Sequence, residues 1–127
     1  MARYLSIVED AYRGTVEEQD DTAVWFTHAL RNAGAEAGIL LRGSAVYYAV
    51  KGQDTRGLRF GTRALTGAPR LDQDLVACIR KSVLVYLVAE DAADRGIPEG
   101  ELLPGVIRVP RRQIGKLVDQ FDRAIHW

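Results

Sequence analysis

Cys78 is the only cysteine in the 127-residue chain, and a thiol is the side chain best suited to attacking or carrying a sulfur atom. Such chemistry needs an exposed sulfur and a neighbour that stabilises the thiolate, and Arg80 and Lys81 follow Cys78 closely. Cys78 also belongs to an apolar stripe with helical spacing, Leu71, Leu75, Cys78 and Ile79. Because it lies near the end of that predicted helix, where the dipole disfavours an anion, we predict a buried structural thiol and keep catalysis by Cys78 as the alternative.

Three acidic residues, Glu90, Asp91 and Asp94, follow an almost wholly apolar run over residues 83–88. If that run is a buried parallel strand, these carboxylates lie at its carboxyl end, where open α/β sheets bind ligands. Carboxylates in the first turn of a helix also suit the helix dipole without any function, and we favour that interpretation. The alternative is a general acid or base, or a ligand contact, for which Glu90 is the candidate.

The segment 52–70 combines four glycines and four arginines with no helical or strand period, apart from a short predicted strand near residues 58–60. Guanidinium groups and exposed backbone amides can hold an anionic ligand, so Arg56, Arg59 and Arg63 are candidate anion contacts. The segment is not a P-loop, because the lysine and the serine or threonine of that motif are missing. We favour a solvated or subunit-facing loop, since loops carry polar residues for surface reasons.

Four aromatic side chains are predicted on outward faces of helices. Trp25 and His28 stand one turn apart, opposite the expected buried stripe of the first helix, and Tyr47 and Tyr48 are predicted to point away from the core side of the next helix. Aromatic residues are enriched in protein interfaces, so we interpret these four as a homo-oligomeric contact in preference to scattered surface aromatics.

Composition excludes several classes of function. The 17 lysines and arginines balance the 17 aspartates and glutamates, so no basic field favours nucleic acid. One cysteine and two histidines leave too few soft ligands for a closed zinc site, and we expect no metal and no cofactor. No apolar run is long enough to cross a bilayer, and the N-terminus lacks the features of a signal peptide. We therefore expect a soluble, cytoplasmic protein with no membrane partner.

The elements that must position these residues alternate between strands and helices. Apolar runs predict strands near residues 4–8, 37–41, 83–88, 106–109 and 124–127. Between them, stripes of period three and four predict helices over 22–33, 71–79 and 114–121, and Ser44 is expected to cap a brief helix. Such alternation implies one α/β domain over residues 1–127, with a mainly parallel sheet and helices on both faces.

The order of these elements resembles the DsrE/DsrF-like (TusD-like) family of small sulfur-relay proteins. The resemblance begins in SIVEDAYRGTVEEQDDTAVWFTHALRNAGAEAGILLRGSAV, continues in VYLVAEDAADRGIPEGELLPGV and ends in LVDQFDRAIHW, so that it covers nearly the whole chain. It implies a three-layer α/β/α subunit with a mainly parallel sheet of about five strands. It also implies assembly into dimers, trimers or hexamers, and it makes Tyr12, in the loop after the first strand, a candidate ligand contact.

The resemblance further implies a persulfide-carrying cysteine near the end of the strand that precedes the RGI turn. Counting back from Arg95 and Gly96, that position falls at or next to Val88, where this chain has no cysteine. Valine cannot attack, carry or release sulfur. We therefore expect a divergent, non-catalytic oligomeric protein associated with sulfur relay, with a sulfur-relay protein as its partner. The alternative is a small-molecule or anion-binding domain that uses the crevice at the carboxyl ends of the strands.

Overall fold

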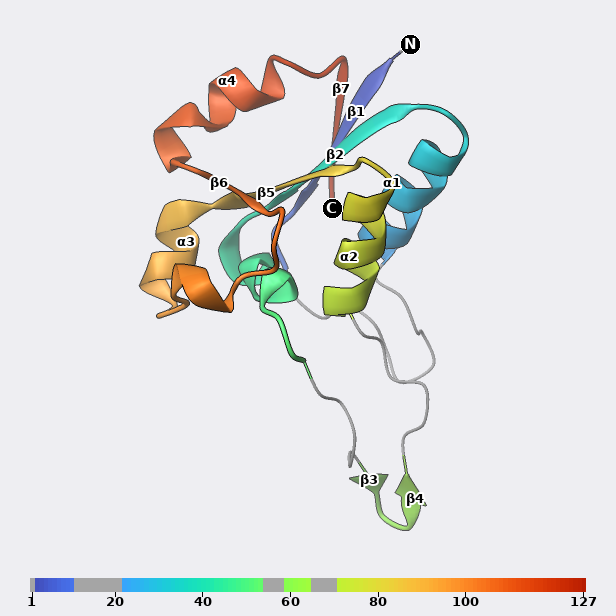
Figure 1. The fold of residues 1–127 in the computed structure, drawn as a ribbon, viewed down its shortest axis with the longest axis vertical. Helices are drawn as coiled ribbons and strands as arrows, with labels where there is room; N and C mark the ends of the chain where they lie inside the picture. Colours follow the sequence, from blue (N-terminus) through green and yellow to red (C-terminus); the bar gives the residue numbers. More distant parts are fainter. Residues whose placement is uncertain (1, 11–21, 54–58, 65–70) are drawn as a thin grey trace.

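A computed structural model describes residues 2–10, 22–53, 59–64 and 71–127 (Figure 1). The strands are β1 (Arg3–Val8), β2 (Glu36–Leu41), β3 (Arg59–Phe60), β4 (Arg63–Ala64), β5 (Leu84–Val88), β6 (Ile107–Val109) and β7 (Arg123–His126). The α-helices are α1 (Thr22–Asn32), α2 (Leu71–Arg80), α3 (Ala89–Asp94) and α4 (Ile114–Val118). Three short 3-10 helices complete the described elements: η1 (Gly43–Ala49), η2 (Glu99–Glu101) and η3 (Arg111–Gln113).

Five strands form one parallel sheet in the order β6-β5-β2-β1-β7. This confirms the predicted α/β class and the sheet of about five strands. The remaining two strands, β3 and β4, pair antiparallel as a separate two-residue hairpin, which Figure 1 shows apart from the sheet. The short strand expected near residues 58–60 is thus present as β3.

The strand order explains how the helices are distributed. The chain steps from β1 to β2, β5 and β6 in one direction and then returns past three strands to place β7 beside β1. Right-handed crossovers put the helices of the three forward steps on one face and the helix of the return step on the other. The side chains agree, because α1, η1, α2 and α3 contribute to one buried cluster and α4 to a second.

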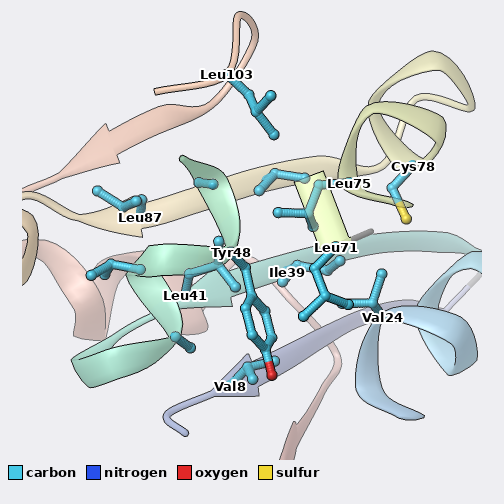
Figure 2. Packing of buried hydrophobic residues seen from close by; sticks show 14 of the residues in the cluster. Val8, Val24, Ile39, Leu41, Tyr48, Leu71, Leu75, Cys78, Leu87 and Leu103 are labelled. Atoms are coloured by element: carbon cyan, nitrogen blue, oxygen red, sulfur yellow. The ribbon is translucent and has the colours of Figure 1, made fainter. Parts of the chain in front are cut away.

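Alternating strand residues supply these two clusters. On β2, Ile39 and Leu41 belong to the larger cluster, whereas Leu40 belongs to the smaller one. On β5, Leu87 faces the larger cluster and Val88 the smaller one. Figure 2 shows the larger cluster, in which side chains from α1, α2 and η1 converge on the sheet. Burial on both faces is the reason that these strands read as nearly continuous apolar runs in the sequence.

Two local expectations were wrong. Tyr48 does not point outward: its side chain is fully buried (0% exposed) in the larger cluster, and its hydroxyl donates to the Asp10 carbonyl oxygen at 3.3 Å. Ser44 does not cap a helix, because it lies inside η1, where its hydroxyl donates to the Glu9 carbonyl oxygen at 3.2 Å. Tyr48 turns inward because a 3-10 helix rotates each side chain about 120° from the last, instead of about 100°. Ser44 is not the cap because η1 already begins at Gly43.

In the part of the chain that the structure describes, no helix is both long and apolar enough to cross a membrane.

Candidate functional site

The carboxyl edge of the sheet carries a line of charged side chains that crosses all five strands. One such side chain lies at the end of each strand or within three residues after it. They are Arg111 after β6, Asp91 after β5, Arg42 after β2, Glu9 after β1 and His126 at the end of β7. The signs alternate over the first four of these strands, so each acidic group has an arginine neighbour on an adjacent strand. This is the edge at which open α/β folds bind ligands.

Asp91 connects three strands of this edge. Its Oδ1 lies 2.6 Å from Arg111 Nη2, and its Oδ2 accepts a hydrogen bond of 2.8 Å from the backbone amide of Gly43. Gly43 has φ +55°, and a Cβ atom there would lie 3.0 Å from the Glu9 carbonyl oxygen. Only glycine therefore lets the chain leave β2 closely enough to present this amide to Asp91.

The hydrogen bonds at Asp91 decide its ionisation. Burial alone would raise the pKa of this carboxyl, but the Gly43 amide and the Arg111 guanidinium outweigh it and hold the pKa below its ordinary value. The pKa of Glu90 is also lowered, first by the hydrogen bonds that the Arg111 backbone amide donates to its two oxygens at 2.9 and 3.1 Å. Both carboxylates are therefore ionised at neutral pH. Their contacts with Arg111 hold η3 against α3.

Glu9 connects the ends of β2, β1 and β7, at the other end of the same edge. Its Oε1 lies 3.3 Å from Arg42 Nε and 3.4 Å from His126 Nε2. Glu9 and His126 therefore lie together at the carboxyl ends of the neighbouring parallel strands β1 and β7. In this chain the two side chains face each other there.

A groove of about 360 Å³ opens where η1 meets the turn after α3. Its lining includes Tyr47, Val50, Gln53, Arg95, Gly96, Ile97, Pro98 and Glu101. Tyr47 is exposed and supplies an aromatic wall, whereas Arg95 is the one cation among these lining residues. The volume lies within the range of small-molecule sites. Because the Glu101 carboxylate is also among the lining residues, the apolar walls with one cation and one carboxylate suit a small polar ligand.

The two positions that bear on sulfur chemistry are both closed to solvent. Val88, at the place where the resembled family carries its cysteine, is fully buried in the smaller cluster. Cys78 is fully buried in the larger cluster, and its sulfur lies on the α1 side of α2 (Figure 2). Burial, with a smaller contribution from the Asp74 carboxylate, raises the pKa of the Cys78 thiol to about 11. The thiol is therefore protonated at neutral pH, as the stripe of apolar neighbours predicted.

The remaining predicted site residues are dispersed. Tyr12 and Arg56 lie outside the described residues, and Arg59 and Arg63 belong to the β3–β4 hairpin, which is not placed beside Glu90. On α1, Trp25 is 58% exposed and His28 is half-buried. Among the described residues, no group of three or more His, Cys, Asp or Glu side chains is arranged to hold a metal ion.

Sequence reasoning missed Glu9, Arg42, Arg111 and His126 as members of the edge. A signal was present, because Glu9, Arg42 and Arg111 lie within two residues after the end of a predicted strand and His126 lies one residue before such an end. The sequence does not show the order of the strands in the sheet. Without that order, the ends of two strands cannot be recognised as neighbours.

Five parallel strands with helices on both faces define a DsrE-like α/β fold. A solved structure with this fold, the ychN protein from E. coli, matches over 100% of both chains with a TM-score of 0.79 and 19% sequence identity. No protein-family model matches the sequence, and no curated protein matches it either. The likeness to the ychN protein is therefore one of fold.

Proposed function

We propose that this chain is an oligomeric subunit of DsrE-like fold that does not itself carry sulfur and acts as a scaffold or partner in a sulfur-relay or related assembly. The observation that carries the proposal is the state of the only thiol. Cys78 is fully buried, and its pKa is about 11, so it presents no thiolate to a sulfur donor. The fold supports the connection to sulfur relay, and the apolar packing of Val88 supports the absence of a carrier at that position.

Alkylation with iodoacetamide tests the non-catalytic part. We expect Cys78 of the native protein to react only as fast as the protein unfolds, and to react quickly in denaturant. An Ala89→Cys variant in a Cys78→Ala background serves as the positive control, because Ala89 is partly exposed at the end of β5. Rapid modification of native Cys78, with loss of any sulfur-accepting activity, would contradict the proposal.

The proposal that the protein is oligomeric depends on its exposed apolar side chains. Four large ones are exposed among the described residues, namely Trp25, Tyr47, Leu84 and Ile107. Of the four aromatics that we interpreted as a contact, Trp25 and Tyr47 keep that proposed role. Tyr48 does not, because it is buried, and neither does His28, because it is half-buried beside residues of α2. Sedimentation equilibrium should show an oligomer that Trp25→Glu or Tyr47→Glu weakens and that Gln73→Glu, at an exposed polar position of α2, leaves intact. A monomer at all accessible concentrations would refute this part.

A second candidate is a small-molecule or anion-binding domain, and the groove beside Tyr47 and Arg95 is the observation that favours it. Thermal-shift measurements against nucleotides, thiols and sulfur oxyanions test it, because a ligand of the native state raises the melting temperature. Arg95→Gln should remove the shift given by an anion, whereas Arg112→Gln, at another exposed arginine, should keep it. No shift across the panel would count against this candidate.

A further inference from the structure

A pocket of about 270 Å³ lies at the amino edge of the sheet, opposite the charged carboxyl edge. Strands β1, β2 and β5 begin there, and the end of α1 meets the turn after α2 beside them. The lining of the pocket includes Arg3, Arg31, Glu36, Ser82, Leu84 and Phe121. The pocket is therefore separate from the groove beside Arg95 and shares no lining residue with it.

Arg31 brings to this pocket a positive charge that no described carboxylate neutralises. Its Nε donates a hydrogen bond of 2.7 Å to the Lys81 carbonyl oxygen, and its Nη1 donates one of 3.3 Å to the Ala35 carbonyl oxygen. Among the described residues, no Asp or Glu side chain forms an ion pair with it. The two backbone carbonyls hold the guanidinium in place, and the N–H groups of Nη2 remain available to a ligand.

Ser82 is the one non-glycine residue with a positive φ in the part of the chain that the structure describes, at +67°. It follows α2 at the position where a helix is usually ended by glycine, with the Val83 amide donating back to the Cys78 carbonyl oxygen. A side chain strains this backbone conformation, which glycine adopts freely. The serine instead places a hydroxyl group at the pocket, directly after the Lys81 carbonyl that Arg31 engages.

The remaining charges limit a ligand to one negative charge. Arg3 Nε lies 2.9 Å from Glu36 Oε2, so these two side chains neutralise each other. Arg31 is then the one cation left among the lining residues, and the carbonyl ends of α1 and α2 offset part of its field. A second negative charge on the ligand would be repelled by the nearby Glu36 carboxylate. A carboxylate has the single charge, and its two oxygens can accept from a guanidinium and a hydroxyl together.

The rest of the pocket offers apolar surface to the body of such a ligand. Leu84 is 41% exposed although it belongs to β5, which has a neighbouring strand on each side. The Phe121 ring stands beside it and carries the Arg3 guanidinium 4.9 Å from its centroid. A cavity of roughly 150 Å³ takes up a benzene ring in an engineered protein core, so 270 Å³ has room for a ring with a carboxylate.

We propose that the pocket at the amino edge binds a small monocarboxylate with an apolar body. The carboxylate accepts hydrogen bonds from the Arg31 guanidinium and the Ser82 hydroxyl, and the apolar body packs on Leu84 and Phe121. Benzoate is a suitable probe, and benzamide is its neutral counterpart of the same shape. Phenyl phosphate carries about two negative charges at about pH 8, above its second pKa of about 6.

Titration of the full-length protein with the three compounds, followed by two-dimensional NMR, tests the proposal. We expect millimolar benzoate to give saturable shifts of the Arg31 Nε–H signal and of the Ser82 and Leu84 amides. Benzamide and phenyl phosphate should bind there at least about tenfold more weakly, because one lacks the charge and the other has one charge too many.

Ser82→Gly gives a readout that a structural role would not give. It relieves the strained backbone and should raise the melting temperature, yet it removes the hydroxyl and should weaken benzoate binding about tenfold. Arg31→Gln should abolish the benzoate shifts, whereas Arg112→Gln, at an exposed arginine on another edge strand's loop, should keep them. If Arg31→Gln fails to fold, the Ser82→Gly titration decides alone.

Three results would overturn the proposal. The first is the absence of any saturable benzoate shift at Arg31, Ser82 and Leu84. The second is binding of benzamide or phenyl phosphate at these residues as tightly as benzoate. The third is an unchanged affinity of Ser82→Gly for benzoate, which would show that the hydroxyl makes no contact with the ligand.

Discussion

The guanidinium of Arg111 and the carboxylate of Asp91 meet at 2.6 Å, although 20 residues separate them in the chain. Arg111 follows β6 and Asp91 follows β5, so the pair joins the ends of two neighbouring parallel strands. Asp91 is largely buried while Arg111 is half-exposed, at 14% and 53% of their side-chain areas. This pair, together with the Gly43 amide, holds the loops after three strands in one arrangement.

Asp91→Asn should therefore lower stability. The amide side chain keeps one acceptor oxygen but loses the charge that both the Gly43 amide and Arg111 engage, and we expect a loss of about 1 to 2 kcal/mol in the free energy of unfolding. Urea denaturation measures it. Asp94→Asn is the control, because Asp94 is exposed and its carboxylate lies 3.9 Å from Arg111, and it should change stability by less than about 0.5 kcal/mol.

The pair of Asp91 and Arg111 also predicts that the stability of the folded protein falls at acid pH. The pKa of Asp91 is lowered in the folded state, so its contribution is present above the unfolded-state pKa, about 4, and is lost as the pH falls through the folded pKa. Wild-type stability should fall below about pH 4 more steeply than that of Asp91→Asn. Parallel curves for the two proteins between pH 5 and about 2 would contradict this account.

The burial of Cys78 predicts that stability falls at alkaline pH. The pKa of this group is raised on folding, whereas that of Asp91 is lowered. The pKa of Cys78 rises from 9.0 to about 11 on folding, so its stabilising contribution is complete below pH 9 and is lost as the pH rises towards 11. Cys78→Ala should be less stable than the wild type at neutral pH by about 1 to 2 kcal/mol, because a buried sulfur is removed. The difference should shrink between pH 9 and 11, which denaturant titrations at several pH values can measure.

Gly38 and Gly115 form a matched pair for substitution by alanine. A Cβ atom at Gly38 would lie 3.0 Å from Cζ of Phe121 and 3.3 Å from the Leu84 carbonyl oxygen. The Leu84 carbonyl oxygen cannot retreat, since it belongs to the backbone of β5, which pairs with β2 at this residue. We expect Gly38→Ala to cost about 1 to 3 kcal/mol in thermal or chemical unfolding.

Gly115→Ala should stabilise the protein, in contrast to Gly38→Ala. Gly115 lies in α4, and a Cβ atom there meets nothing within 4 Å. Alanine restricts the unfolded chain and favours the helix, so a gain of about 0.5 to 1 kcal/mol is expected. Destabilisation by both substitutions would show that the contact with Phe121 does not explain the cost at Gly38.

Tyr47 and Tyr48 are adjacent in sequence and should respond differently to truncation. Tyr48→Ala opens a large cavity in the main core and should cost about 3 to 5 kcal/mol, or prevent folding. Tyr47→Ala removes an exposed ring and should change the stability of the subunit by less than about 1 kcal/mol. Circular dichroism melting curves of both variants make the comparison. Equal losses would contradict the inward placement of Tyr48.

Much of the fold could be predicted because the information is local. The apolar run over 83–88 identifies β5, and the stripe through Leu75 and Cys78 identifies both α2 and the burial of the thiol. Tyr48 was misplaced because η1 is a 3-10 helix, and a seven-residue segment with alanine and valine around it fits either period.

The sequence by itself thus determined the class of fold, the succession of strands and helices and the burial of Cys78, since hydrophobic periodicity and residue type act over short stretches of chain. Only the tertiary structure decided which strand ends become neighbours. The line from Arg111 through Asp91 to Glu9 and His126 depends on the order β6-β5-β2-β1-β7. The pocket beside Arg31 and Ser82 depends on how the ends of α1 and α2 meet. Both are contacts between residues far apart in the chain, and no local pattern specifies them.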